Sequence, residues 1–368
     1  MEFKNNLLTA TPFSDRRFCN IMPAAIPTIA GGSSKNYFGD GSDGAVTISS
    51  NTNWATTTGV DDTGVVIKNF TILTIDAGVV VTAANRARAM LVYVTGDCTI
   101  NGELSMTKRG AVGAPSGDCV IYRVPVSGGG STGTAFSDFS NETQEGSPTT
   151  KQYGAPMVGA AGGLGSTMYG ATAGVNGVNG QCGGGGSGGS YSYSNSSGSG
   201  SAGTSYSGGS GGGGCAWPNP GSGNSAGDAE PYGGAGGRGR NSSYGDGGGG
   251  AGNPGGGSDG GGGSGEAGTG GVLFLIVGGN LDIGAVGVIS ANGGKGGDRT
   301  REDNFTGNGG GGSGGGSLNV LYAGTLSNSG SLHATGGAGG VGATAPSTGF
   351  PGGKGGDGSV TIEQIEAA

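Results

Sequence analysis

The sequence predicts an all-β protein, made of a short β-solenoid with repeated coils and of glycine-rich insertions folded as a polyglycine II helix sandwich. Three observations lead to this fold class. Glycine occupies 96 of the 368 positions, about 26% against roughly 7% in average proteins. Short runs rich in Val, Ile and Thr recur between glycines, and no stretch has helical periodicity. Between residues 159 and 269, Leu, Ile, Val and Phe occur only three times, so side chains cannot build a core there.

Along the chain, four regions follow one another. Residues 1–38 are a proline-interrupted lead, for which we expect a role in attachment or docking. Residues 39–126 form a β-strand, solenoid-like domain, and residues 127–158 form a polar connecting excursion. Residues 159–368 form the glycine-rich polyglycine II domain, with interleaved strands in 270–291, 317–335 and 359–365. Within the second region, alternation and turn residues predict strands at 45–49, 65–69, 71–75, 79–82, 90–95 and 99–100.

A repeat connects the strands with the glycine tracts. The segments NLDIGAVGVISANGGKGG (280–297) and TLSNSGSLHATGGAGG (325–340) share an order of strand, glycine turn, second strand and glycine tract. Such self-similarity predicts stacked coils from which the tracts leave at one corner. Glycine can adopt the polyproline II conformation, whose outward backbone groups neighbouring tracts can satisfy. A disordered linker is the alternative, but tracts of similar length that alternate with aromatic-bearing loops favour order.

Composition excludes several classes of protein. The net charge of -8 leaves too little positive charge for a surface that binds a nucleic acid. The 13 prolines do not alternate with glycine in the three-residue register of collagen, which excludes a collagen triple helix. The longest apolar run, 272–277, is too short to cross a bilayer, and the first residues lack the apolar stretch of a signal peptide. Five cysteines form no C-x-x-C pair. A bridge between Cys182 and Cys215 is left open.

No catalytic chemistry is indicated, so we predict that the protein is not an enzyme. Three G-x-S-x-G matches, at 185–189, 208–212 and 311–315, lie in low-complexity sequence rather than between a strand and a helix. The single histidine, His333, has no second histidine with which to bind a metal. The acidic groups lie in turn-forming contexts, which leaves a glycan-cleaving enzyme as a minor alternative. We therefore expect no catalytic residue, no metal and no cofactor.

The loops between glycine tracts carry the residues expected to bind a partner. Tyr, Trp, Ser, Gly and Asn dominate them, and these residues are typical of recognition loops because aromatic rings give contact area at low entropic cost. The alternative is that the rings only pin the loops to the scaffold. The predicted receptor-binding residues are Tyr191, Tyr193, Tyr206, Trp217, Tyr232, Arg238, Arg240, Tyr244, Phe305 and Phe350.

The tracts and loops of residues 159–358 resemble the glycine-rich adhesins at the tips of bacteriophage tail fibres. The first 110 residues depart from the attachment domain of that family. The resemblance implies a virion-surface protein, made in the host cytoplasm, that binds a host cell-surface receptor, either a protein or a glycan. Other virion proteins would contact residues 1–38, without membrane insertion. The alternatives are a head or tail decoration protein of the virion and a secreted bacterial adhesin.

Overall fold

The structure is a computed structural model. It describes most of residues 38–111 and 263–365, together with a few short stretches between them. The described residues are 38–61, 64–111, 121–125, 136–138, 150–153, 241–242, 245–246, 251, 263–298, 309–342 and 351–365. All regular elements among them are strands. No helix in these ranges is long and apolar enough to span a membrane.

Most strands belong to parallel sheets. In chain order they are β1 (Gly44–Ile48), β2 (Thr52–Trp54), β3 (Val66–Ile75), β4 (Val80–Ala83), β5 (Met90–Val94), β6 (Cys98–Ile100), β7 (Glu103–Ser105), β13 (Val272–Val277), β14 (Leu281–Ile283), β15 (Val288–Ser290), β16 (Ser317–Tyr322), β17 (Leu326–Asn328), β18 (Ser331–His333) and β19 (Ser359–Gln364). Shorter antiparallel pairings join β8 (Ile121–Pro125), β9 (Phe136–Asp138) and β10 (Thr150–Tyr153), and join β11 (Asn241–Ser242) to β12 (Gly245–Asp246).

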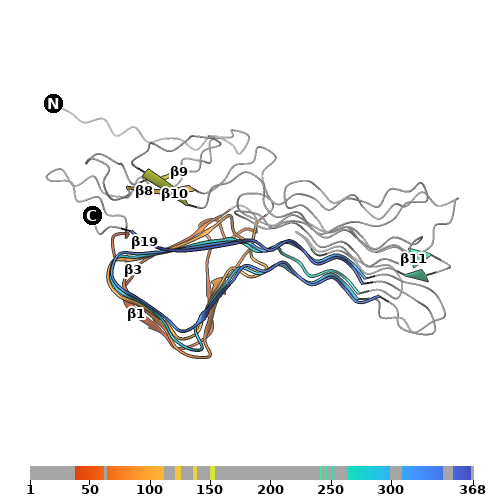
Figure 1. Cartoon of the computed structure of the whole chain (residues 1–368), viewed down its shortest axis with the longest axis horizontal. Helices are drawn as coiled ribbons and strands as arrows, with labels where there is room; N and C mark the ends of the chain where they lie inside the picture. The colour runs from red at the N-terminus through yellow and green to blue at the C-terminus, as the bar shows by residue number, and fades with distance from the viewer. Residues whose placement is uncertain are drawn as a thin grey trace.

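The largest sheet has nine strands in the order β17-β14-β6-β3-β5-β13-β16-β19, with β1 paired to β3. A second sheet of five strands has the order β18-β15-β7-β4-β2. Strand β3 connects two halves of the large sheet, because Val66–Phe70 pairs with β5 while Leu73–Ile75 pairs with β6. The sheet therefore curls along β3, as the outline at the left of Figure 1 shows.

The predicted fold class, a short β-solenoid beside a polyglycine II sandwich, is wrong. The parallel strands among the described residues instead form a curled half-barrel. The cause is β3, which runs without a break from Val66 to Ile75. It joins into one sheet strands that the sequence pattern assigns to separate coils of a solenoid. Runs of Val, Ile and Thr look alike whichever neighbour they pair with, so their spacing could not reveal the sheet order.

The interior of the half-barrel is aliphatic. Every residue of β5 and β13 is buried, which explains their continuous apolar sequences, MLVYV and VLFLIV. Val92 and Leu275 point into the main cluster, while their neighbours Tyr93 and Phe274 belong to a second cluster on the other face of the same sheet.

The strand positions themselves follow the predicted runs. The runs at 45–49, 79–82, 90–95 and 99–100 overlap β1, β4, β5 and β6, and the two runs at 65–69 and 71–75 fuse into β3. The short strands β2 and β7 were not anticipated. The lead before residue 38 lies outside the described residues.

Four glycine-rich stretches leave the sheets and return to them, and we call them the tracts: 292–298, 309–316, 335–342 and 351–358. The first follows β15 and the second precedes β16, while the third follows β18 and the fourth precedes β19. Figure 1 shows them extending together from one side of the half-barrel. Backbone hydrogen bonds join them at intervals of three residues, as from Gly312 N to Gly353 O and from Gly315 N to Gly356 O, both 2.9 Å.

Candidate functional site

The predicted receptor-binding residues lie outside the described residues. This holds for Tyr191, Tyr193, Tyr206, Trp217, Tyr232, Arg238, Arg240, Tyr244, Phe305 and Phe350. Two of them, Phe305 and Phe350, belong to the segments 299–308 and 343–350, which connect consecutive tracts. The described tracts therefore fix where these two segments begin and end, although not how their side chains lie.

The tract ends farthest from the strands meet one another. Gly310 N donates to Gly297 O at 3.0 Å, Gly340 N donates to Gly310 O at 2.7 Å, and Gly352 N donates to Gly340 O at 2.9 Å. These three bonds join all four tracts at their outer ends. Both connecting segments consequently start and finish at one place on the molecule.

Three of the tracts carry a side chain at every third position. Because the hydrogen bonds between tracts recur every three residues, such positions lie on the same side of a tract. In 335–342, Thr335, Ala338 and Val341 are exposed and the glycines Gly336, Gly337 and Gly340 are buried. The equivalent positions are Asn292, Lys295 and Asp298 in the first tract, and Pro351, Lys354 and Asp357 in the fourth.

The second tract, 309–316, is buried throughout, and Ser313 is its one residue with a side chain. The Ser313 hydroxyl donates to Gly268 O at 2.9 Å and accepts from Gly294 N at 2.7 Å. A Cβ placed on Gly312 would overlap the carbonyl oxygen of Gly337. The interior between the tracts thus accepts glycine and one small hydroxyl that makes its own hydrogen bonds.

Two lysine–aspartate pairs fasten the third tract at both ends. Lys295 Nζ contacts Asp298 Oδ2 at 2.6 Å, and Asp298 Oδ1 accepts from Val341 N at 2.7 Å. In the fourth tract, Lys354 Nζ contacts Asp357 Oδ1 at 2.5 Å, and the same oxygen accepts from Gly336 N at 2.8 Å. Each pair spans three residues, which the three-residue period places on one side of its tract.

These contacts lower the pKa of both aspartates. Partial burial acts to raise the pKa of Asp298, but hydrogen bonds from Lys295 and from Val341 N outweigh it and hold that pKa below its ordinary value. The balance is the same at Asp357, where burial is outweighed by hydrogen bonds from Lys354 and Gly336 N, so its pKa is also lowered. Both carboxylates are therefore stabilised in the charged form.

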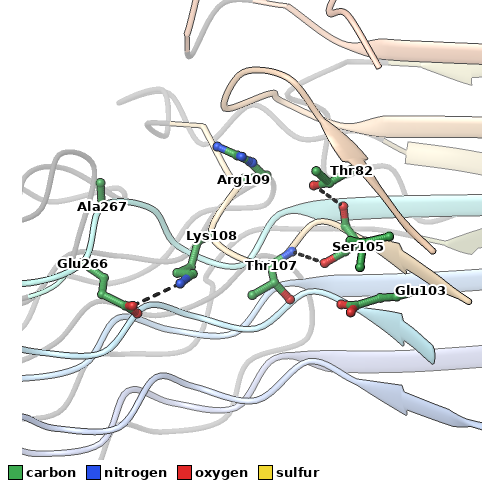
Figure 2. Close-up of a pocket in the computed structure, with 9 residues that line it drawn as sticks. Thr82, Glu103, Ser105, Thr107, Lys108, Arg109, Glu266 and Ala267 are labelled. Carbon is green, nitrogen blue, oxygen red and sulfur yellow. Dashed lines mark hydrogen bonds and ion pairs between the residues drawn. The ribbon is translucent and has the colours of Figure 1, made fainter. Parts of the chain in front are cut away.

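A hollow of about 520 Å³ lies where the tracts meet the five-stranded sheet (Figure 2). Strands β4 and β7 form one wall, the turn after β7 forms the second, and the chain before β13 closes the third. Its lining residues are Val80, Thr82, Glu103, Ser105, Thr107, Lys108, Arg109, Glu266 and Ala267.

Glu266 holds one side of this hollow in place. Its Oε1 accepts from Lys108 Nζ at 3.1 Å, and its Oε2 accepts from Lys295 N at 2.7 Å. Partial burial acts to raise the pKa of Glu266, but the hydrogen bonds from Lys295 N and Lys108 outweigh it and lower that pKa. The carboxylate thus connects the turn after β7 to the first tract.

Comparison with family models, with curated proteins and with solved structures gave no match. Among the described residues, no group of three or more His, Cys, Asp and Glu is placed to hold a metal ion.

Sequence reasoning missed both the lysine–aspartate pairs and the hollow. A signal for the pairs is present, because the hexapeptide Gly-Gly-Lys-Gly-Gly-Asp occurs twice, at 293–298 and at 352–357. The hollow had no such signal. It combines residues about 160 positions apart, and only the pairing of β7 with β15 and the return of the chain before β13 bring them together.

Proposed function

We propose that the chain is a non-enzymatic protein of a bacteriophage particle that binds the host surface through its aromatic segments, 190–207, 215–232, 238–244, 299–308 and 343–350, which lie between glycine-rich stretches. The observation that supports this most is the junction of the tract ends at Gly297, Gly310, Gly340 and Gly352. Segments 299–308 and 343–350, which contain Phe305 and Phe350, are held at this junction at both of their ends. Holding a loop at both ends reduces the entropy that it loses on binding.

The contrast between tract and segment supports the same proposal. Within the tracts, a Cβ on Gly309 would overlap Gly340 O, and one on Gly336 would overlap Gly355 O, so their sequence is tightly constrained. The connecting segments contain the aromatic residues Phe305 and Phe350, and 299–308 also contains four charged residues. A constrained scaffold with variable loops is the common arrangement for recognition sites.

The proposal includes the partners and the location. The receptor is a protein or a glycan of the host cell surface, and the protein lies on the surface of the virion. Residues 1–38 are the segment through which other virion proteins would hold it. Aromatic anchors would supply most of the binding energy, because a few buried rings usually dominate an interface.

An adsorption assay on purified particles tests the proposal. Particles that carry Phe305→Ala, Phe350→Ala, Trp217→Ala or Tyr232→Ala should assemble in normal yield and lose adsorption to host cells. The matched control is Val286→Ala, since Val286 is an exposed apolar side chain at the turn between β14 and β15, away from the tract ends. Unchanged adsorption in all four variants, with reduced particle yield or stability, would refute receptor binding and favour a decoration protein.

A further inference from the structure

The five-stranded sheet carries a row of hydroxyl groups on its outer face. Thr82, Ser105 and Ser290 lie side by side on β4, β7 and β15, because the strands pair in register. Neighbouring strands are about 4.8 Å apart, so the three residues form a regular polar row. Glu103 stands two residues before Ser105 on the same face of β7. Thr82, Ser105 and Glu103 line the hollow in Figure 2.

Thr82 Oγ1 donates to the backbone oxygen of Ser105 at 2.8 Å, whereas the hydrogen bonds around Ser290 lead toward Glu103. Ser290 Oγ donates its one proton to Glu103 Oε1 at 2.6 Å. The contacts of Ser290 Oγ with Ser105 Oγ at 2.7 Å and with Thr107 Oγ1 at 2.9 Å must then be bonds that Ser290 accepts. Ser105 and Thr107 accept in turn from the backbone, at Thr107 N and Asn292 N. No described residue donates to Glu103 Oε2, so this side of the hollow offers an acceptor.

The opposite side of the hollow carries positive charge. Lys108 and Arg109 lie on the turn after β7, on the side away from Glu103 in Figure 2. Lys108 is paired with Glu266. Arg109 makes no direct ion pair among the described residues, although its charge helps to stabilise the Asp61 carboxylate from a greater distance. A guanidinium presents a fork of donors that matches a carboxylate or a phosphate.

The turn that holds these cations is strained. Arg109 N donates to Met106 O at 3.1 Å, which closes a turn with Lys108 at its third position. Lys108 has a φ of 57° and is the one non-glycine residue in the described ranges with a positive φ. Glycine normally occupies this position, and strain of this kind is concentrated at functional sites. The backbone of Lys108 is also enclosed, because a Cβ on Gly268 would overlap Lys108 O.

We propose that this hollow binds an acidic saccharide. The hydroxyl groups of the sugar would donate to Glu103 Oε2, and its carboxylate or other anionic group would contact Arg109. A ligand with donors at one end and an anion at the other satisfies both sides, which a neutral sugar or a simple anion does not. The volume of about 520 Å³ lies in the range of small-molecule sites. This site is separate from the aromatic segments and does not depend on their function.

Isothermal titration calorimetry with the full chain at low ionic strength tests the proposal, with trigalacturonate as the acidic probe and maltotriose as the neutral one. Trigalacturonate should bind saturably, and maltotriose should bind at least tenfold more weakly. Arg109→Gln and Glu103→Gln should each weaken trigalacturonate binding at least tenfold. Gln can still accept from Ser290, so the second variant keeps the hydroxyl row. Circular dichroism checks that both variants stay folded.

Two control variants separate binding in the hollow from a general effect of charge and from binding by the aromatic segments. Lys68→Gln removes a half-buried cation on β3, 3.9 Å from Asp43, and should leave binding unchanged. Trp217→Ala changes a proposed receptor-binding residue and should also leave it unchanged. The proposal is wrong if trigalacturonate does not bind, if maltotriose binds equally well, or if Arg109→Gln behaves like Lys68→Gln. Loss of binding in Trp217→Ala alone would place the saccharide in the aromatic segments instead.

Discussion

Replacing Gly312 with alanine should destabilise the tracts strongly. The new Cβ would overlap the carbonyl oxygen of Gly337, and Ala338 O would be 2.6 Å away. Overpacking of this kind costs about 1–3 kcal/mol. Moving the neighbouring tract, 335–342, away would also weaken the hydrogen bonds from Gly337 N to Ser313 O and from Gly340 N to Gly310 O. At about 1 kcal/mol each, these bring the expected loss to about 3–5 kcal/mol.

Urea unfolding followed by circular dichroism measures this loss. Ala338→Val is the matched control, because Ala338 lies in the tract 335–342 but is exposed. A surface change of this kind usually stays within about 0.5 kcal/mol of zero. Equal unfolding midpoints for Gly312→Ala and the wild type would refute the close packing of the tracts, whatever the control shows.

Two further predictions concern titratable groups. The pKa values of Asp298 and Asp357 are lower in the folded protein than in the unfolded chain. At a pH above the ordinary Asp pKa, about 3.9, both carboxylates therefore stabilise the folded state. This stabilisation is lost as the pH falls through the pKa values of the folded protein. Acid unfolding of the double variant Asp298→Asn and Asp357→Asn should be less steep below pH ~4, and an unchanged acid limb would argue against the pairs. Burial, with the charge of Asp97 beside it, raises the pKa of the Cys98 thiol, so Cys98 should resist Ellman's reagent until denaturant is added. Rapid labelling of Cys98 in the native protein would contradict its burial.

The positions of most strands could be predicted from sequence, but their assembly could not. Alternating Val, Ile and Thr identify β1 and β4, and continuous apolar residues identify β5 and β13. The pairing of β5 with β13 could not be predicted, because the two strands are separated by about 180 residues and nothing local specifies their contact. The unbroken β3 was missed for the same reason, and with it the curled sheet.

The candidate sites also combine features that the sequence reveals with features that only the fold reveals. The tracts and their connecting segments are visible in sequence because glycine content changes sharply there. The three-residue spacing of Asn292, Lys295 and Asp298 was also present, but its meaning depends on which neighbour each side chain reaches. Glu103 and Arg109 carry no local motif at all. Their place in the hollow comes from sheet register and from the turn at Lys108.

Amide hydrogen exchange along 309–316 tests the central claim, that the glycine tracts form an ordered scaffold. Gly312 N and Gly315 N are buried and donate to Gly353 O and Gly356 O, so their exchange should require opening of the tracts. We expect protection comparable to that of Leu275 in the fully buried strand β13. Exchange of both glycine amides at the rate of an unfolded chain, while Leu275 remains protected, would contradict the scaffold and leave the connecting segments without support.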